Sequence, residues 1–287
     1  MNKRLLLLIT IPIISTGLLI FLWQMESAPV ITYFPEDDQT GFTETSTTLE
    51  MVSQKSRDSY EMIWTSKSVS EHELYLRQDA SLLFKNGQLL GIRSKWKENT
   101  DTILMKDTFN GEDSKYFQVL SFHHGEVHYP DDEIKSVHHM TYDQLYVIDS
   151  PNTPLESFKT PETDYEHEWF DLLDHTTQQQ LVYNWKRLLA YFDIDKDAYD
   201  KVPFTDLNKF NTEPLPSFTQ KQTNQIMGQL WEGIYKNYIL RAKNVTGKSV
   251  SSYIPLILFD KQHDHLIVLF EWNGQKEKLI QQYPDDF

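Results

Sequence analysis

Five of the ten histidines lie in one short stretch of the chain, at His123, His124, His128, His138 and His139. Neutral imidazole is the most common transition-metal ligand and a frequent proton carrier. Three acidic residues at 131–133 lie between these histidines and could add carboxylate ligands. If Gly125 centres a tight turn, His123 and His128 approach each other across a hairpin. His123, His124 and His128 are therefore candidate metal ligands, although their spacing matches no zinc signature. The alternative is that they form a solvated hairpin end.

A second candidate set of His167, Asp171 and His175 has helical spacing. The three residues are four apart, so a helix would place them on one face. This pattern differs from the metalloprotease helix, in which a second histidine stands one turn after the first. Here Asp171 occupies that position. The alternative is the polar outer face of a helix whose other side carries apolar residues.

Two further patterns are weaker. Residues 193–197 alternate aspartate with other residues, as a calcium loop does, but Ala198 and Phe204 stand where an EF-hand needs glycine and glutamate. The aromatic residues Trp231, Tyr235 and Tyr238 would share one helix. Because such rings stack on sugars and peptides, they are candidate binding residues, with core packing as the alternative.

Residues 58–149 are predicted to form an antiparallel β lobe of five to seven strands. Asn86-Gly87 between two apolar runs is a strong hairpin signal. Asn110-Gly111 and His124-Gly125 are predicted to mark further turns. Residues 150–163 contain three prolines and are predicted to be a linker.

Residues 164–287 are predicted to form a second, α+β lobe. Thr163 with Glu166, and Thr219 with Gln222, have the spacing of capping boxes and indicate two helix starts. A three-stranded meander should follow, with Asn273-Gly274 as one turn. The predicted fold class is therefore α+β, with an N-terminal transmembrane helix, an antiparallel sheet lobe, a helical segment and a C-terminal β-meander. Whether the two parts form one lobe or two is left open.

The N-terminus predicts a membrane anchor. Residues 1–4 form a basic n-region, and residues 5–23 are uncharged over a length that matches the ~30 Å hydrocarbon core. Residues 24–57, predicted to be an extracytoplasmic stalk, hold six acids and no base before Lys55. The positive-inside rule then places the N-terminus in the cytoplasm and the C-terminus outside the cell membrane. A cleaved signal peptide is the alternative, which Pro29 after the small residues 27–28 disfavours.

Composition limits the function classes. The formal net charge of −15 argues against a nucleic-acid partner. There is no cysteine, so disulfides and thiol chemistry are excluded. We expect an extracytoplasmic domain that binds a membrane or envelope protein, or another envelope component, in a regulatory, sensing or structural role. The alternative is an extracytoplasmic hydrolase that uses histidine and carboxylate residues. No cofactor is expected, except that the histidines leave open the binding of a divalent metal ion.

Overall fold

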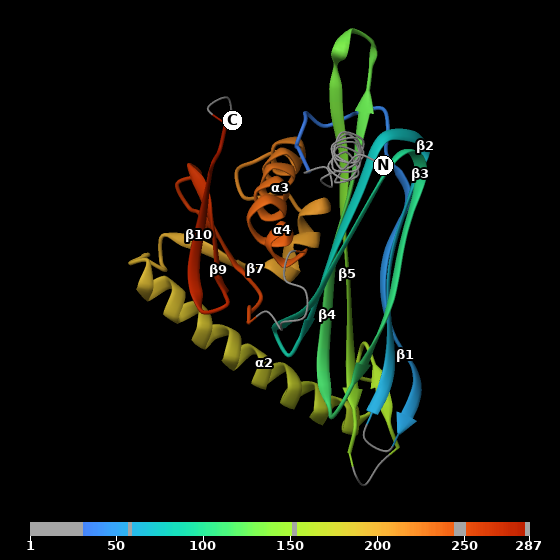
Figure 1. The fold of residues 1–287 in the computed structure, drawn as a ribbon. Coiled ribbons are helices and arrows are strands. Elements are labelled where there is room, and N and C mark those ends of the chain that lie inside the picture. The colour runs from blue at the N-terminus through green and yellow to red at the C-terminus, as the bar shows by residue number, and fades with distance from the viewer. Residues whose placement is uncertain (1–30, 57–58, 151–153, 244–250, 285–287) are drawn as a thin grey trace, which may run out of the picture. The chain divides into compact units, whose positions relative to one another are not determined.

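A computed structural model describes residues 31–56, 59–150, 154–243 and 251–284. The protein has a mixed α+β fold with mostly antiparallel sheets and few helices, as the sequence predicts (Figure 1). No helix within these ranges has the length and apolar character needed to cross a membrane. The predicted anchor at 5–23 lies outside the described residues.

The large sheet has the strand order β1-β2-β4-β5-β6, and β3 pairs with β2 beside this path. All its pairings are antiparallel. The strands are β1 (Phe42–Ser56), β2 (Ser59–Lys85), β3 (Gln88–Gly111), β4 (Lys115–His128), β5 (Ile134–Ile148) and β6 (Glu156–Phe158).

Strands β2 and β3 form one long hairpin that folds back on itself. Their register is interrupted between Val69 and Leu74, where the hairpin bends. The first half of β2 pairs with β1 and the second half pairs with β4. The two halves of β2 then face each other, because Trp64 Nε1 donates to Ser81 Oγ at 3.0 Å. The sheet is therefore folded into two layers, with β1 in the first layer and β4 and β5 in the second.

Of the four predicted turns, two are confirmed and two are wrong. Asn110-Gly111 forms the end of β3 and pairs with the start of β2, and the connection to β4 follows at residues 112–114. Asn86-Gly87 and Asn273-Gly274 are two-residue hairpin turns in which both residues have positive φ. His124-Gly125, in contrast, lies inside β4, where Gly125 pairs with Val137 of β5. A Cβ at Gly125 would lie 2.4 Å from Leu74 Cδ1, so the glycine allows two strands to approach closely and does not form a turn.

The sheet contains fewer and longer strands than the sequence suggests. Residues 59–148 form four strands, of which β2 has 27 residues and β3 has 24. Part of the predicted stalk is also a strand, since β1 pairs with β2 along most of its length. The described residues from Ile31 onward belong to one compact unit.

The small sheet has the order β10-β9-β8-β7, and its last three strands form the predicted C-terminal meander. The strands are β7 (Tyr199–Pro203), β8 (Leu256–Asp260), β9 (His265–Trp272) and β10 (Gln275–Gln282). The helical elements are the short 3₁₀ turn η1 (Pro130–Asp132), α2 (Asp164–Tyr191), the 3₁₀ segment η2 (Phe204–Asn211), α3 (Gln220–Ile234), the π-helical turn η3 (Tyr235–Ile239) and α4 (Leu240–Lys243). Both predicted capping boxes are present, at Thr163 and Thr219.

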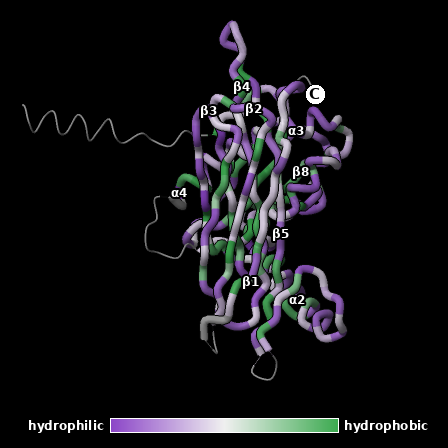
Figure 2. Tube along the Cα trace, turned by 90° about the vertical axis from the view of Figure 1, so that its right-hand side faces the viewer, coloured by the Kyte–Doolittle hydropathy of each residue, from purple (hydrophilic) through white to green (hydrophobic). Residues whose placement is uncertain are grey.

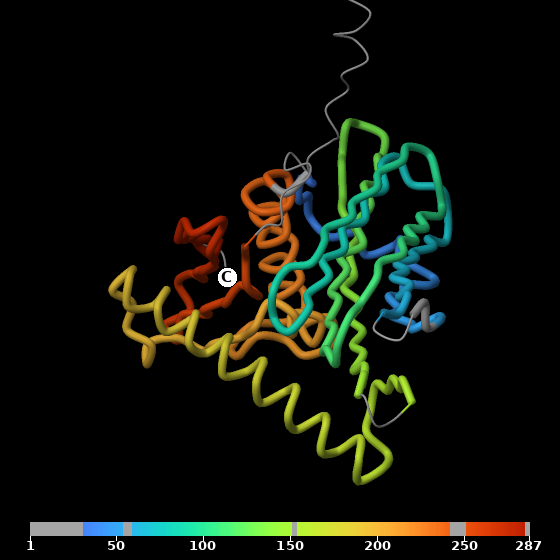
Figure 3. Tube along the Cα trace, turned by 60° about the horizontal axis from the view of Figure 1, so that its bottom comes forward, coloured from blue at the N-terminus to red at the C-terminus, as the bar shows by residue number. Residues whose placement is uncertain are grey.

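Helix α2 is continuous and connects the two sheets. Aromatic residues near its N-terminus pack against Tyr146 and Phe158 of the large sheet. Leu188 near its C-terminus packs against β8 and β9 of the small sheet. In Figures 1 and 3 the helix runs past the small sheet and reaches one end of the large sheet. Along the long strands, apolar and polar residues alternate in Figure 2. The helices pack against the second layer of the large sheet.

Candidate functional site

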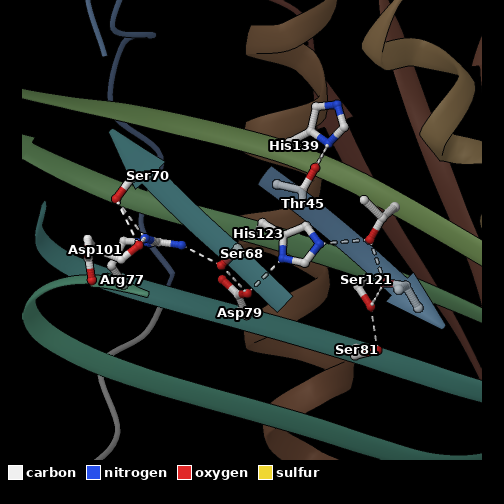
Figure 4. Close-up of polar contacts among 12 residues, drawn as sticks. Thr45, Ser68, Ser70, Arg77, Asp79, Ser81, Asp101, Ser121, His123 and His139 are labelled. Atoms are coloured by element: carbon white, nitrogen blue, oxygen red, sulfur yellow. Dashed lines mark hydrogen bonds and ion pairs between the residues drawn. The ribbon is translucent and has the colours of Figure 1, made fainter. Parts of the chain in front are cut away.

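Polar side chains occupy one end of the space between the two layers of the large sheet. Alternate residues of a strand point to the same face, and from Tyr60 to Ser70 every second residue of β2 is buried. At one end these residues are apolar. At the other end they are serines, and around these serines the second half of β2 and the neighbouring strands place the hydroxyl, charged and imidazole side chains drawn in Figure 4. The labelled members of this polar cluster are Thr45, Ser68, Ser70, Arg77, Asp79, Ser81, Asp101, Ser121, His123 and His139.

Asp79, His123 and Thr141 form a hydrogen-bonded relay at the centre of the cluster. His123 Nδ1 lies 2.7 Å from Asp79 Oδ2, and His123 Nε2 lies 2.8 Å from Thr141 Oγ1. An ionised carboxylate can only accept, so Nδ1 donates to Asp79 and Nε2 faces the hydroxyl. Asp79 and His123 are fully buried. Hydroxyl, imidazole and carboxylate therefore stand in the order found in acyl-transfer enzymes.

The hydroxyl of Thr141 is not a free nucleophile. It is hydrogen-bonded to Thr47 Oγ1 of β1, which itself donates to Ser121 Oγ at 2.7 Å. Ser121 in turn is 2.6 Å from Ser81 Oγ. These hydroxyls connect strands of both layers, so the contact that occupies Thr141 also joins the layers. The arrangement fits a hydrogen-bond network that holds the two layers together better than it fits a reaction centre.

Arg77 lies at the outer end of the cluster and is fully buried. Its guanidinium donates to Ser70 Oγ at 2.9 Å, to the carbonyl of Asp101 at 2.7 Å, and to Ser68 Oγ. Ser68 passes this contact on by donating to Asp79 Oδ2 at 2.7 Å. Burial lowers the pKa of Arg77, while the charge of Asp79 opposes this effect. A buried cation is therefore linked to a buried carboxylate through one serine.

Phe42 covers this end of the cluster. Its ring centre lies 4.8 Å from the Arg77 guanidinium and 6.3 Å from the ring centre of His123. A surface pocket of about 250 Å³ is lined by Phe42, Thr45 and His139 together with other residues in the ranges 36–37, 40–44 and 137–138. Thr45 Oγ1 is 2.9 Å from His139 Nδ1. His123 and Thr141 do not line this pocket, so it does not expose the relay.

Strand pairing gathers four histidines, in a way different from the predicted hairpin. His123 pairs with His139, and His124 pairs with His138, across β4 and β5. His123 points between the layers, and His124, the next residue, points to the opposite face. Burial lowers the pKa of His124 to about 3 and that of His138 to about 4. Both imidazoles are therefore neutral at pH 7.

The candidate metal ligands are not assembled into a metal site. His128 is exposed at the end of β4, where it stacks on Tyr75 with ring centres 3.7 Å apart. It lies on the opposite face of β4 from His123. His167, Asp171 and His175 are exposed on α2. Within the described parts of the chain, no group of three or more histidine, aspartate or glutamate side chains could hold a metal ion.

The aromatic candidates of α3 and η3 lie in the core. Trp231 stacks on Phe122 with ring centres 4.6 Å apart, and Tyr238 is 2.7 Å from Ser252 Oγ. Tyr235 accepts a hydrogen bond from Gln78 Nε2. All three side chains are fully buried, which does not fit the surface binding role considered for them.

Most members of the polar cluster escaped prediction from sequence. Arg77, Asp79, Thr47 and Ser121 belong to no motif, and they meet only through the bend in β2 and the pairing of β4 with β5. One signal was available. Ser66, Ser68 and Ser70 alternate with other residues, which places three hydroxyls on one face of a strand.

Comparison with known proteins assigns no family to the chain. No family model and no curated protein matches it. Among solved structures, it is similar to the solution structure of AT1g01470 from Arabidopsis thaliana, with 10% sequence identity over 49% of this chain and 93% of that chain. The TM-score is 0.25, so this likeness carries no argument about fold or function.

Proposed function

We propose that this chain is a membrane-anchored extracytoplasmic binding module, which recognises a membrane or envelope protein, or another envelope component, in a regulatory, sensing or structural role. The observation that carries the proposal is that the groups of the relay are already hydrogen-bonded within the sheet. Asp79 and His123 have no exposed surface, and Thr141 is held by Thr47. Thr141 is partly exposed, but its hydroxyl is already bound to His123 and Thr47, so a substrate carbonyl would have to displace a contact that joins the two layers.

The recesses at the surface also favour binding over catalysis. One groove of about 490 Å³ lies between α3, η3 and the last two strands of the small sheet. Another of about 310 Å³ lies between the two halves of β3 and is lined by Arg93, Lys95 and Asp107. Both follow the edges of sheets, where an extended partner segment can be accommodated. The net charge of −15 supports a protein or neutral partner over nucleic acid.

Crosslinking in intact cells tests this proposal. Cells expressing the full chain are treated with a membrane-impermeant crosslinker, and the products are identified by mass spectrometry. We expect one partner to be enriched over a control with an unrelated anchored domain. Protease added to intact cells should also degrade the region after residue 31. Failure to enrich any partner would count against the binding role, and protection from protease would count against the location.

A hydrolase remains the second candidate, because the relay has the order hydroxyl, imidazole and carboxylate. It would require an opening of the layers that frees Thr141. Ester and peptide substrates offered to the full chain test this candidate, with Thr141→Val and His123→Gln as variants. Turnover lost in both variants, while their unfolding midpoints stay near that of the parent, would establish the hydrolase.

A further inference from the structure

The small sheet ends in a regular strand edge. Strand β10 is an edge strand of this sheet and pairs with β9 in an unbroken register from Gln275 to Gln282. Such an edge presents main-chain donors and acceptors that can pair with another strand. The other end of this sheet is different, because β7 has five residues and ends at Pro203. Short length and proline both protect an edge.

The long edge of β3 is protected in another way. Lys95 Nζ donates to the carbonyl of Leu104 in the other half of β3 at 3.0 Å, and Arg93 forms an ion pair with Asp107. Inward-pointing charges of this kind close the side of a sheet against a further strand. Among these three edges, β10 is the one that keeps both length and regularity without such protection.

A groove lies directly beside β10. Four consecutive residues, 278–281, line it, and because successive side chains point to opposite faces, the groove reaches the main chain of the strand. Leu279 of β10, Val268 of β9 and Leu230 of α3 provide apolar walls. On the helix side, a Cβ placed on Gly233 would meet nothing within 4 Å. The groove therefore has space for apolar side chains.

The helix wall of the groove has unusual geometry. Lys236 and Asn237, which line it, belong to the π-helical turn η3. Asn237 Nδ2 donates to the carbonyl of Gly233 at 2.9 Å and so supports this turn. Single π-helical turns are rare and are found often at functional sites. The turn is thus a second, independent observation at the same place.

The opposite face of β10 is basic. Lys276 Nζ lies 4.5 Å from the ring centre of Tyr191, and Lys278 Nζ lies 5.4 Å from that of Phe192. Glu271 of β9 lies opposite Lys276 and also forms an ion pair with Arg187 at 4.0 Å, so this face carries three cationic side chains and one carboxylate on a chain of net charge −15. A strand added to β10 would place alternate side chains in the apolar groove and beside the lysines. The matching sequence alternates apolar and acidic residues.

We propose that β10 and the groove beside α3 bind an extended acidic peptide segment of the partner, which adds to the small sheet as a fifth strand. This inference rests on the proposed binding function and specifies its surface. The main-chain edge favours a peptide over a lipid, because an acyl chain offers nothing to pair with it.

A synthetic peptide tests the docking surface. The probe is fluorescein-labelled Glu-Val-Glu-Val-Glu-Val-Glu-amide, added to the full chain in detergent and followed by fluorescence anisotropy. We expect saturable binding that weakens about tenfold or more when alternate peptide nitrogens are methylated or when lysine replaces glutamate. The variant Gly233→Leu should weaken binding to a similar extent, because its side chain fills the groove. Lys276→Glu with Lys278→Glu should do the same through charge.

Controls make the result decisive. Lys221→Glu, on α3 but outside the groove, should leave binding unchanged, and thermal unfolding should show that Gly233→Leu still folds. Equal binding by parent and Gly233→Leu, or binding to phosphatidylglycerol vesicles in place of the peptide, would overturn the inference. The cell crosslinking experiment, repeated with Gly233→Leu, separates the two proposals. A partner captured by both chains rejects the groove, whereas a partner captured by neither rejects the binding function.

Discussion

The two ends of the space between the layers are built from the same strands but with different chemistry. At one end Leu49, Met62, Leu83, Val119 and Leu145 belong to an apolar cluster. At the other end the same strands supply hydroxyls, Asp79, Arg77 and His123. Apolar packing tolerates small shifts between strands, whereas hydrogen bonds require particular distances and angles. The apolar end therefore supplies stability, and the polar end selects one register of the folded hairpin.

The polar end is also where the chain leaves buried groups without partners. Arg77 Nε, Asp79 Oδ1 and Ser66 Oγ are buried polar atoms with no hydrogen bond. An unsatisfied buried polar atom costs roughly 1–3 kcal/mol. The apolar end has no such cost. This difference predicts that substitutions at the two ends destabilise the protein for different reasons.

Asp79→Ala should have the largest effect. It removes the acceptor of His123 and Ser68 and leaves Arg77 as a buried cation without its nearest carboxylate. Breaking a buried ion pair on one side costs about 3–5 kcal/mol. Guanidinium unfolding of the full chain in detergent, followed by tryptophan fluorescence, measures this loss. Asp79→Asn, which keeps one acceptor, is the control. A loss below about 1 kcal/mol would show that the network does not hold the layers.

Leu83→Ala examines the apolar end of the same strand. Leu83 is 1% exposed, so truncation leaves a cavity beside Phe117 and Val119. The expected loss is about 3 kcal/mol, within the range for buried leucine. The same unfolding experiment measures it. Leu83→Met, which conserves volume, should recover most of the stability, whereas no polar substitution at Asp79 should do so completely. If both ends recover equally with conservative variants, the proposed difference is wrong.

The local parts of this fold could be predicted from sequence. The two Asn-Gly turns and the two capping boxes depend on a few adjacent residues, whose chemistry selects one backbone geometry. Strand β1 could not be recognised, because the side chains that it points inward include Thr45 and Thr47. Strand patterns are found by alternating apolar residues, and a polar interior removes that signal.

The candidate site depends on contacts between distant segments. The sequence identifies His123 as a candidate metal ligand. Its partner Asp79 is 44 positions away, however, and reaches His123 only because β2 bends. The sequence near Val69–Leu74 contains neither glycine nor proline to announce the bend. Likewise His139 joins His123 through the register of β4 and β5, which no short motif encodes.

Acidification should lower the free energy of unfolding through the buried histidines His124 and His138. The pKa of His124 is lowered to about 3 and that of His138 to about 4, against about 6.5 when unfolded. Below pH 6.5 the unfolded chain therefore binds protons that the folded chain does not, and stability falls as pH decreases. Between pH 7 and pH 5 each histidine should cost about 2 kcal/mol.

His124→Gln measures this contribution. The amide of glutamine can replace His124 Nε2 beside Ser136 Oγ, which lies 3.3 Å away, but it does not titrate. Unfolding free energies of both chains are compared at pH 7 and pH 5. The variant should lose about 2 kcal/mol less than the parent over this interval. Equal losses would mean that His124 is protonated in the folded protein without cost. The quantity compared is the change in unfolding free energy with pH. Carboxylates such as Glu126, whose pKa is raised by burial, contribute equally to this change in both chains and cancel.

Phe42→Ala should have the smallest effect on stability and the most specific effect on the polar end. The ring lies over Arg77 and His123, and a cation–π contact at a half-exposed position contributes about 0.5–1 kcal/mol. Removing it opens a path from the pocket beside Thr45 to the buried network. Amide hydrogen exchange should accelerate around Thr45 and His123 and stay unchanged around Leu49 and Leu83. Phe42→Leu, which covers the opening without a π face, should restore slow exchange but not the lost stability. Acceleration at both ends would show that the layers open as one unit, and the polar end would then have no separate role in holding the register.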